Sequence, residues 1–228
     1  MVIDTRDHDA LVDGLRGCDA LVHLAAHASP PNQPDGVYND NTTSSYNALS
    51  AAAALGITRV CLASSVNALG GVFSRVPRYD YFPLDEQHPT YAEDPYGLSK
   101  WVLERQADAF ARRWAATRIA SLRFHWLVKR RERAMDLTLR DSKTALGHLW
   151  SYTLLHEASR ACLLALTADF AGHEVVYIVA PYTVATKPTL ELAREHHPTT
   201  EIRGDLTGHA AFYNCNRAAR LLGWKHED

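Results

Sequence analysis

The chain has 228 residues, a length that suits one domain of ordinary size or a domain with a small appendage. Hydrophobic residues make up 46% of the chain and charged residues 22%, which is typical of a soluble globular protein with a buried core. The formal net charge of −2 gives no indication of a nucleic-acid partner or of an anionic membrane surface. We expect neither a membrane-spanning helix nor a secretion signal, because no run of 18 apolar residues and no basic-then-apolar start is present.

The residue types that commonly bind metals or form disulfides show no binding pattern. The four cysteines are far apart, without CxxC spacing, and favour free thiols in a reducing, cytoplasmic compartment: Cys18, Cys61, Cys162 and Cys215. The twelve histidines include no HExxH pattern, so we expect no metal site. The basic run KRRER at residues 129–133 is followed by acidic residues, which favours a solvated helix or loop face over a polyanion site.

The first quarter of the chain alternates amphipathic segments with apolar runs. HDALVDGLRG, residues 8–17, predicts a helix that Asp7 can cap. DALVHLAA, residues 19–26, is a continuous apolar run, as in the buried strand of a parallel sheet. A Pro/Asn/Gly loop then leads to a predicted helix over residues 37–55 and a second apolar strand, TRVCLASS, over residues 58–65.

The remaining elements follow the same alternation. Residues 67–95 form a long irregular segment, and loops of that length inside compact domains tend to carry function. Residues 95–113 predict a strongly amphipathic helix, and RIASLRFHWLV predicts a strand over residues 118–128. The later predicted elements are a helix over 156–166, a strand over 174–180, and helices over 189–197 and 216–224. This alternation favours βαβ crossovers and a mostly parallel sheet in an α/β fold.

The start of the helix over residues 95–113 carries a candidate proton-transfer pair. Asp94 can cap this helix, and Tyr96 and Lys100 then lie on one face, one turn apart. A tyrosine hydroxyl titrates near pH 10, and a nearby ammonium group would lower that pKa and make the hydroxyl useful near neutral pH. Ser64 and Ser65 end the preceding strand, where the carboxyl end of a parallel strand faces a ligand crevice.

Taken in order, these segments resemble the extended short-chain dehydrogenase/reductase family, the NAD(P)-dependent epimerases, dehydratases and dehydrogenases. The resemblance is carried by DALVHLAA, Asn41, VCLASSVNALGG, YGLSK and SLRFHW, and it extends from about residue 2 to residue 224. It implies an NAD(P)-binding, Rossmann-like fold with NAD or NADP as the cofactor.

The resemblance also implies roles for the candidate catalytic residues. Tyr96 matches the acid/base of the family, and Lys100 matches the lysine that lowers the tyrosine pKa and holds the nicotinamide ribose. Ser65 resembles the serine that polarises the reacting oxygen, with Ser64 as the alternative. In the implied reaction, hydride passes between the carbinol carbon of the substrate and nicotinamide C4 while Tyr96 moves the hydroxyl proton.

Further cofactor contacts follow from the same resemblance. Leu24, Ala25 and Ala26 resemble the strand-end segment that lines the cofactor ribose and pyrophosphate. Asp4, followed by Thr5, resembles the aspartate that contacts the adenine amino group.

Three more residues match positions near the cofactor. Asn41 is similar to the helix asparagine of the family, which is more often structural than catalytic. Phe124 and His125 fall where the backbone meets the nicotinamide carboxamide. A packed histidine is a better interpretation of His125 than a second proton donor.

One family feature is absent from the sequence. No glycine-rich GxxGxxG turn is present, and residues 2–4 (VID) correspond to the third strand of the family, so the first two strands and helices are missing. We therefore expect the strand over residues 19–26 to be an exposed, apolar sheet edge. A start further upstream is favoured as the explanation. Complementation by a partner or a swapped dimer, and a degenerate non-binding relative, are the alternatives. The segment that distinguishes NAD from NADP is missing too.

The small size of the C-terminal part favours a small substrate. We expect residues 1–128 to form a partial Rossmann core and residues 129–228 a small substrate-binding region with returning elements of the core. Uronate dehydrogenase, a compact relative, has about this length and a similar serine–serine–asparagine stretch. The absence of the Thr-Asp-Glu of 4,6-dehydratases argues against dehydration. The absence of the usual Pro-Gly turn after SLRF argues against a nucleotide-sugar pocket.

The function that we predict from the sequence is NAD(P)-dependent oxidation or reduction of a sugar, a sugar acid or a similar small alcohol or carbonyl compound. The alternatives are a sugar epimerase that retains NAD, and a non-catalytic Rossmann-like binding protein. From the family we also expect a homodimer formed through the tyrosine-bearing helix and its predecessor.

Overall fold

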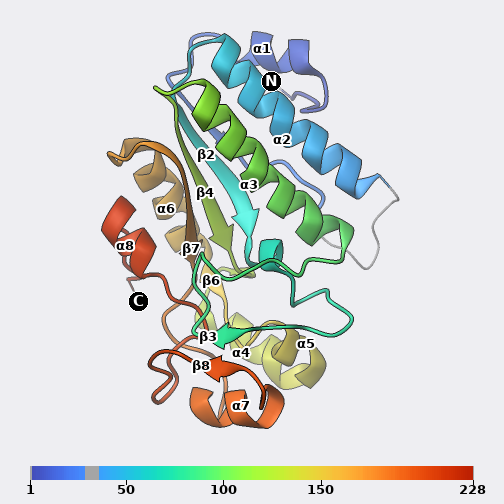
Figure 1. The fold of residues 1–228 in the computed structure, drawn as a ribbon, viewed down its shortest axis with the longest axis vertical. Coiled ribbons are helices and arrows are strands. Elements are labelled where there is room, and N and C mark those ends of the chain that lie inside the picture. Colours follow the sequence, from blue (N-terminus) through green and yellow to red (C-terminus); the bar gives the residue numbers. More distant parts are fainter. Residues whose placement is uncertain (1, 29–35, 228) are drawn as a thin grey trace.

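The computed structural model describes residues 2–28 and 36–227, which form a central sheet, helices on both of its faces and a smaller part beyond one end (Figure 1). The helices are α1 (His8–Leu15), α2 (Val37–Ala54), the 3₁₀ helix η2 (Val66–Leu69), α3 (Pro95–Arg113), α4 (Arg131–Arg140), α5 (Ser142–Gly147), α6 (Leu155–Thr167), α7 (Thr189–His196) and α8 (Asn216–Leu222). The strands are β1 (Ala20–His23), β2 (Arg59–Ser65), β3 (Tyr81–Phe82), β4 (Arg118–Phe124), β5 (Leu127–Val128), β6 (Thr153–Leu154), β7 (Gly172–Ile178) and β8 (Glu201–Ile202).

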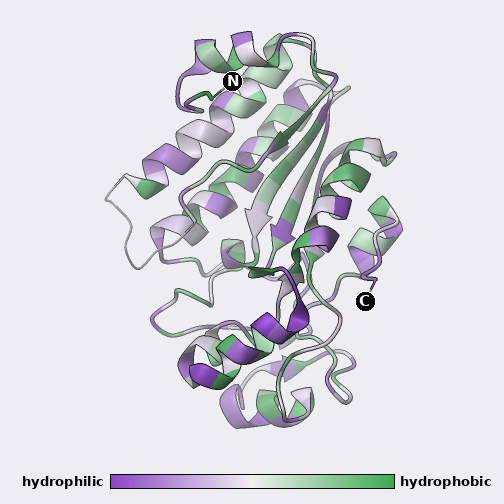
Figure 2. Ribbon diagram, turned by 180° about the vertical axis from the view of Figure 1, so that it is seen from behind, coloured by the Kyte–Doolittle hydropathy of each residue, from purple (hydrophilic) through white to green (hydrophobic). Residues whose placement is uncertain are grey.

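The central sheet has four parallel strands in the order β1-β2-β4-β7. Its register places Ser65, Phe124 and Ile178 side by side, so β2, β4 and β7 end together. Figure 2 shows these strands as largely hydrophobic along their length, with more hydrophilic arrowheads on two of them. The apolar strands are what a sheet covered on both faces requires, and Ser64, Ser65 and Arg123 place polar groups near its carboxyl edge.

Helices pack on both faces of the sheet and bury its apolar side chains. On one face α2 and α3 pack together and enclose Leu49, Leu103 and Phe110 against β2 and β4. On the other face α6 and α8 enclose Ala161 and Trp224 against β2, β4 and β7. The α/β fold with a parallel sheet that the sequence predicts is therefore confirmed.

The smaller part lies beyond the carboxyl ends of the strands. It contains two parallel two-stranded ladders, β3 with β8 and β5 with β6, together with α4, α5 and α7 (Figure 1). A cluster of apolar side chains that includes Phe82, Leu149 and Phe212 holds it together. Its position places it over the edge of the sheet where the candidate residues Ser65 and Tyr96 lie.

The structure corrects several predicted boundaries. Residues 2–4 form no strand, because the sheet has no strand beyond β1 for them to pair with among the described residues. The strand expected over 19–26 ends at His23, and Leu24 beyond it is 61% exposed at the sheet edge, as expected for an unpaired edge. The strand expected over 118–128 divides into β4 and β5, which belong to different ladders.

The bounds of other predicted elements agree closely with the structure. The helix over residues 95–113 has the predicted bounds, and the helix over 37–55 ends one residue early. The basic run at 129–133 leads into α4 with its charged side chains exposed, in agreement with a solvated helix face. The division of the chain at residue 128 stays a prediction.

Candidate functional site

Tyr96 and Lys100 are positioned by the start of α3. Asp94 caps the helix by accepting a hydrogen bond from the backbone N–H of Gly97 at 2.8 Å, and Pro95 occupies the first turn. Both side chains are buried, with 8% of Tyr96 and 4% of Lys100 exposed. They face the carboxyl end of β2 and are not directed into solvent.

Gly97 allows this helix start to approach η2 very closely. A Cβ atom at this position would lie 2.6 Å from the carbonyl oxygen of Asn67 and 2.7 Å from Asp94 Oδ2, both closer than real contacts. Any other side chain would therefore displace the helix from the end of β2. The glycine beside Tyr96 is thus a requirement of the site geometry.

The two candidate serines face different partners. The side chain of Ser65 interacts with that of Tyr96, whose pKa it lowers, and the Ser65 hydroxyl accepts the N–H of Asn67 at 3.1 Å. The hydroxyl of Ser64 instead donates to Glu104 Oε1 at 2.7 Å. Only Ser65 is therefore placed beside the tyrosine hydroxyl.

The ammonium group of Lys100 lies at the end of β2, where Nζ donates to the carbonyl oxygen of Ala63 at 2.7 Å. Burial lowers the pKa of Lys100 to about 8, and the nearby Glu104 carboxylate opposes this shift. Glu104 is in turn fully buried in a bidentate ion pair with Arg123, with N–O distances of 2.8 Å. The lysine is therefore held by the backbone of β2, near a buried ion pair.

The pKa of Tyr96 differs from what the Tyr-Lys spacing predicts. Burial raises this pKa above its usual value of 10, and the hydrogen bond with Ser65 opposes the rise. Lys100 Nζ lies 5.7 Å from the centre of the Tyr96 ring and donates to Ala63. In the free protein, desolvation of the phenolate therefore outweighs the expected lowering by Lys100.

These residues line a cavity of about 450 Å³, here called the Tyr96 cavity. Its walls include eight of the predicted residues: Leu24, Ala26, Ser64, Ser65, Tyr96, Lys100, Phe124 and His125. The sequence interpretation missed Phe73, Trp126 and His148, which also line it. Phe73 follows the Gly70-Gly71 turn in the long loop and packs edge-on against the Tyr96 ring, with centroids 6.2 Å apart. Two adjacent glycines in a long loop were the feature of the sequence that could have indicated a site residue near Phe73.

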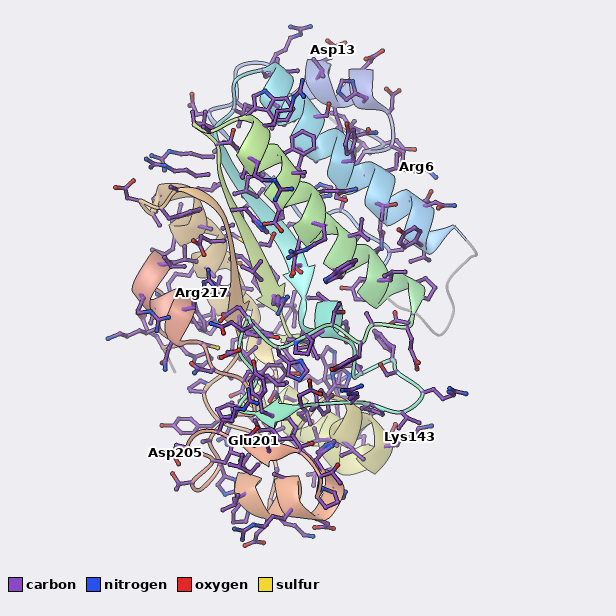
Figure 3. All side chains as sticks on the ribbon, viewed as in Figure 1. Arg6, Asp13, Lys143, Glu201, Asp205 and Arg217 are labelled. Atoms are coloured by element: carbon purple, nitrogen blue, oxygen red, sulfur yellow. The ribbon has the colours of Figure 1, made fainter. Side chains whose placement is uncertain are left out.

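A second cavity of about 430 Å³, the Asp4 cavity, adjoins the first through the shared residue Ala26. It is lined by the other predicted cofactor residues: Asp4, Thr5, Ala25 and Asn41. Arg6, labelled beside α2 in Figure 3, pairs with both Asp4 and Asp40 across the mouth of this cavity. The hydrogen bonds from Arg6 lower the pKa of Asp4 to about 2, so Asp4 is a carboxylate that can accept hydrogen bonds from a ligand.

Asn41 connects the strand-end segment to α3. Its Oδ1 accepts the backbone N–H of His27 at 2.8 Å, and its Nδ2 donates to Ser99 Oγ at 3.0 Å. Ser99 in turn donates to the carbonyl oxygen of Tyr96. The amide of Asn41 is therefore occupied by protein contacts, and its place in the Asp4 cavity is structural.

The backbone amide of His125 is also occupied. It donates to Thr153 Oγ1 at 3.0 Å, while His125 Nδ1 accepts the N–H of Trp126 at 2.7 Å. Burial and the neighbouring His148 hold the pKa of His125 well below 6.5, so its ring is neutral near pH 7. The packed interpretation of His125 therefore agrees with its surroundings better than the interpretation as a proton donor.

The two cavities suit the two ends of a dinucleotide. The Tyr96 cavity offers a buried ammonium and two hydroxyls beside apolar and aromatic walls, as a nicotinamide riboside needs. The Asp4 cavity offers a carboxylate, which an adenine amino group needs. The residues present therefore fit both ends of NAD(P), whereas the sequence has no glycine-rich turn for its phosphates.

The described residues also bear on metal sites and on membrane-spanning helices. Residues 2–28 and 36–227 contain no group of three or more His, Cys, Asp or Glu side chains that could hold a metal ion. Within the same ranges, no helix has both the length and the apolar character needed to cross a membrane.

Comparison with known proteins agrees with this geometry. A curated relative is the L-arabinose 1-dehydrogenase (NAD(P)(+)) of Haloferax volcanii, 31% identical over 134 residues that make up 56% of this chain and 52% of that enzyme. The chain thus spans about half the length of that relative.

Solved structures show the same fold. UDP-glucose 4-epimerase from Bifidobacterium longum, in complex with NAD+ and UDP, matches 100% of this chain and 78% of its own, with a TM-score of 0.70 and 18% identity. A mutated uronate dehydrogenase matches 100% of this chain and 66% of its own, with a TM-score of 0.66 and 23% identity. The family model described as the NAD dependent epimerase/dehydratase family matches residues 1–138. With its tyrosine, lysine and serine gathered at the carboxyl end of a parallel sheet, the chain belongs to the NAD dependent epimerase/dehydratase family.

Proposed function

We propose that the protein is an NAD(P)-dependent oxidoreductase whose substrate is a sugar, a sugar acid or a similar small alcohol or carbonyl compound. The observation that carries this proposal is the convergence of Tyr96, Ser65 and Lys100 on one cavity at the end of β2. The dehydrogenase from Haloferax volcanii, which is named for L-arabinose, supports a sugar as the substrate.

The residues of the Tyr96 cavity have separate roles in such a reaction. The cofactor, when bound, exchanges a hydride with the reacting carbon of the substrate. Tyr96 takes the proton from the substrate hydroxyl during oxidation and returns it during reduction, and Ser65 donates a hydrogen bond to the reacting oxygen. Lys100 holds the cofactor ribose and favours the phenolate of Tyr96. The raised pKa of Tyr96 means that its hydroxyl carries a proton near pH 7 in the free protein.

A different hydrogen-bonded chain gives no support to a hydrolase. Ser121, His173 and Asp108 are linked in the order of a Ser-His-Asp triad, with distances of 2.8 and 2.7 Å. Ser121, however, is fully buried in the middle of β4 and cannot meet a substrate. This chain connects α3 with the sheet and is structural.

Cofactor titration and one tyrosine variant test the proposal. NADH and NADPH are titrated into the protein while nicotinamide fluorescence is followed, and sugars are screened for net reduction of NAD+ or NADP+. Tyr96→Phe should abolish turnover and leave cofactor affinity nearly intact, whereas Tyr91→Phe, a half-buried tyrosine paired with Asp80, should change neither. Absence of binding by either cofactor at millimolar concentration contradicts the proposal. Tightly retained NAD without net redox chemistry identifies an epimerase instead.

The protein is further proposed to be a cytoplasmic homodimer. Four free cysteines support a reducing compartment. The surface of α2 and α3 supports a dimer, because Tyr46 is 52% exposed, Leu98 is 37% exposed and Trp101 is half-buried there. Sedimentation equilibrium tests this: Leu98→Glu should dissociate a dimer, and a wild-type monomer contradicts it.

A further inference from the structure

An unusual turn follows α5. Leu149 and Trp150 are consecutive non-glycine residues in the left-handed region, with φ angles of 48° and 50°. Each such residue costs about 1–2 kcal/mol, and backbone strain of this kind gathers at functional sites. The turn is held in place because Leu149 is fully buried and the Trp150 ring stacks on Phe212, with centroids 6.3 Å apart. The residue that this turn positions is His148.

The imidazole of His148 forms part of the wall of the Tyr96 cavity. The indole of Trp126 stacks on it, with centroids 5.0 Å apart and an angle of 23° between the rings, and the His125 ring lies 5.3 Å away. His148 Nδ1 is buried and has no hydrogen-bond partner among the described residues. Because Nδ1 is enclosed, a ligand in the cavity would meet the His148 ring at its other nitrogen, Nε2.

Both imidazoles of this wall are uncharged near neutral pH. Burial lowers the pKa of His148 to about 4, and burial together with His148 holds the pKa of His125 well below 6.5. A neutral imidazole offers one N–H donor and one acceptor nitrogen. His125 accepts the Trp126 N–H at Nδ1, so its proton is on Nε2. The Nε2 of His125 is buried, so the uncharged ring that a ligand can meet on this wall is that of His148, beside the flat surface of Trp126.

That combination suits neutral hydroxyl groups on a ring with apolar C–H faces. Binding sites for small molecules commonly pair aromatic walls with a few placed polar groups that fix orientation. We propose that His148, held against Trp126, binds a hydroxyl group of a polyhydroxylated substrate in the Tyr96 cavity and so determines which sugars are accepted. This inference rests on the proposed function, and it names a specificity-determining residue that touches the substrate away from the reacting carbon.

Two substitutions at one position separate hydrogen bonding from packing. His148→Phe keeps an aromatic ring against Trp126 and removes both nitrogens, and His148→Asn restores a donor and an acceptor. With L-arabinose as the probe sugar, His148→Phe should raise KM about tenfold, the loss expected for one hydrogen bond, and change kcat less than about threefold. His148→Asn should recover part of the loss in KM. NADH affinity should be unchanged in both variants.

A matched control uses another histidine of the same region. His196 packs beside Trp150, with centroids 5.6 Å apart, and belongs to α7 away from the Tyr96 cavity. His196→Phe should leave KM unchanged, and thermal melting should show that all three variants fold. An unchanged KM in His148→Phe, in a protein that turns over the sugar, overturns the inference and leaves the proposed function intact.

A binding measurement covers the case in which L-arabinose is not turned over. The imidazole Cε1–H resonance of His148, identified by its loss in His148→Phe, is followed by NMR while L-arabinose, D-glucose or a hexuronic acid is added. Movement of this resonance with at least one sugar is the expected result. A resonance that no sugar moves overturns the inference. Failure to bind NADH or NADPH, by contrast, overturns the proposed function.

Discussion

Ser64 donates a hydrogen bond to Glu104 Oε1 at 2.7 Å, while the next residue in the chain, Ser65, shares a cavity wall with Tyr96 and lowers its pKa. The serine doublet at the end of β2 is therefore divided in function. Both residues line the Tyr96 cavity, but the Ser64 hydroxyl is occupied by the buried ion pair of Glu104 and Arg123, and the Ser65 side chain interacts with Tyr96.

This division predicts different effects for two otherwise identical substitutions. Ser65→Ala should lower kcat about 10²-fold, the loss typical of one hydrogen-bond donor to the reacting oxygen. Ser64→Ala should keep kcat within about threefold of wild type and lower the free energy of unfolding by about 1 kcal/mol, because Glu104 keeps its ion pair with Arg123. Steady-state kinetics and urea unfolding measure both. The reverse order of the two kcat values would assign the polarising role to Ser64.

The close contact at Gly97 leads to a second prediction. In Gly97→Ala the new methyl group meets the Asn67 carbonyl, so the start of α3 must move away from η2 and carry Tyr96 away from Ser65. We expect a loss of about 1–3 kcal/mol in unfolding free energy and a fall of about 10²-fold in kcat/KM.

Gly36→Ala is the control for this substitution. Gly36 precedes α2, and a Cβ there would approach nothing closer than 3.7 Å. Its kcat/KM should equal that of the wild type. A Gly97→Ala protein with wild-type kinetics would show that the distance between the tyrosine and the serine is not critical.

The sequence was sufficient to place the candidate residues together because their positions follow from local patterns. A capped amphipathic helix fixes Tyr96 and Lys100 on one face, and a continuous apolar run fixes Ser65 at a strand end. The rest of the cavity has no such local signal. β5 and β6 have two residues each and pair across 24 intervening residues, from Val128 to Thr153.

The turn after His148 could not be foreseen for a related reason. Leucine and tryptophan disfavour positive φ, and only their packing in the second part of the molecule stabilises that conformation. The pKa of Tyr96 also depends on burial, which residue spacing does not reveal. The sequence therefore predicts the positions of the candidate residues at the end of β2 well, and the other walls of the cavity poorly.

The buried ion pair of Glu104 and Arg123 leads to a third prediction. Glu104→Leu leaves the guanidinium of Arg123, which is 4% exposed, without its carboxylate, and should lower the unfolding free energy by about 3–5 kcal/mol. The double variant Glu104→Leu/Arg123→Met removes both charges and should recover most of that loss. Glu195→Gln is the control, because the pair of Glu195 with Lys187 is half exposed and its loss should change the unfolding free energy little. Equal losses in the single and double variants would contradict the role of the unpaired charge.

The lowered pKa of Lys100 makes stability depend on pH in a defined direction. Burial disfavours the ammonium form, so the pKa falls from 10.5 in the unfolded chain to about 8 in the folded protein. Between these values the unfolded chain binds more protons, and the contribution of Lys100 to the unfolding free energy rises as the pH rises from about 8 to 10.5. Below pH 8 both states are protonated and this dependence disappears.

Lys100→Met removes the titrating group and keeps a long side chain. The unfolding free energy of the wild type minus that of the variant should therefore rise with pH across this window, by up to about 3 kcal/mol. Urea unfolding at a series of pH values measures this difference, and subtraction removes the contribution of the buried tyrosines that titrate in the same range. Lys187→Met, at a lysine that is 53% exposed, should give a curve parallel to that of the wild type. A difference that stays constant in Lys100→Met would mean that the ammonium of Lys100 is as well solvated in the folded protein as in the unfolded chain.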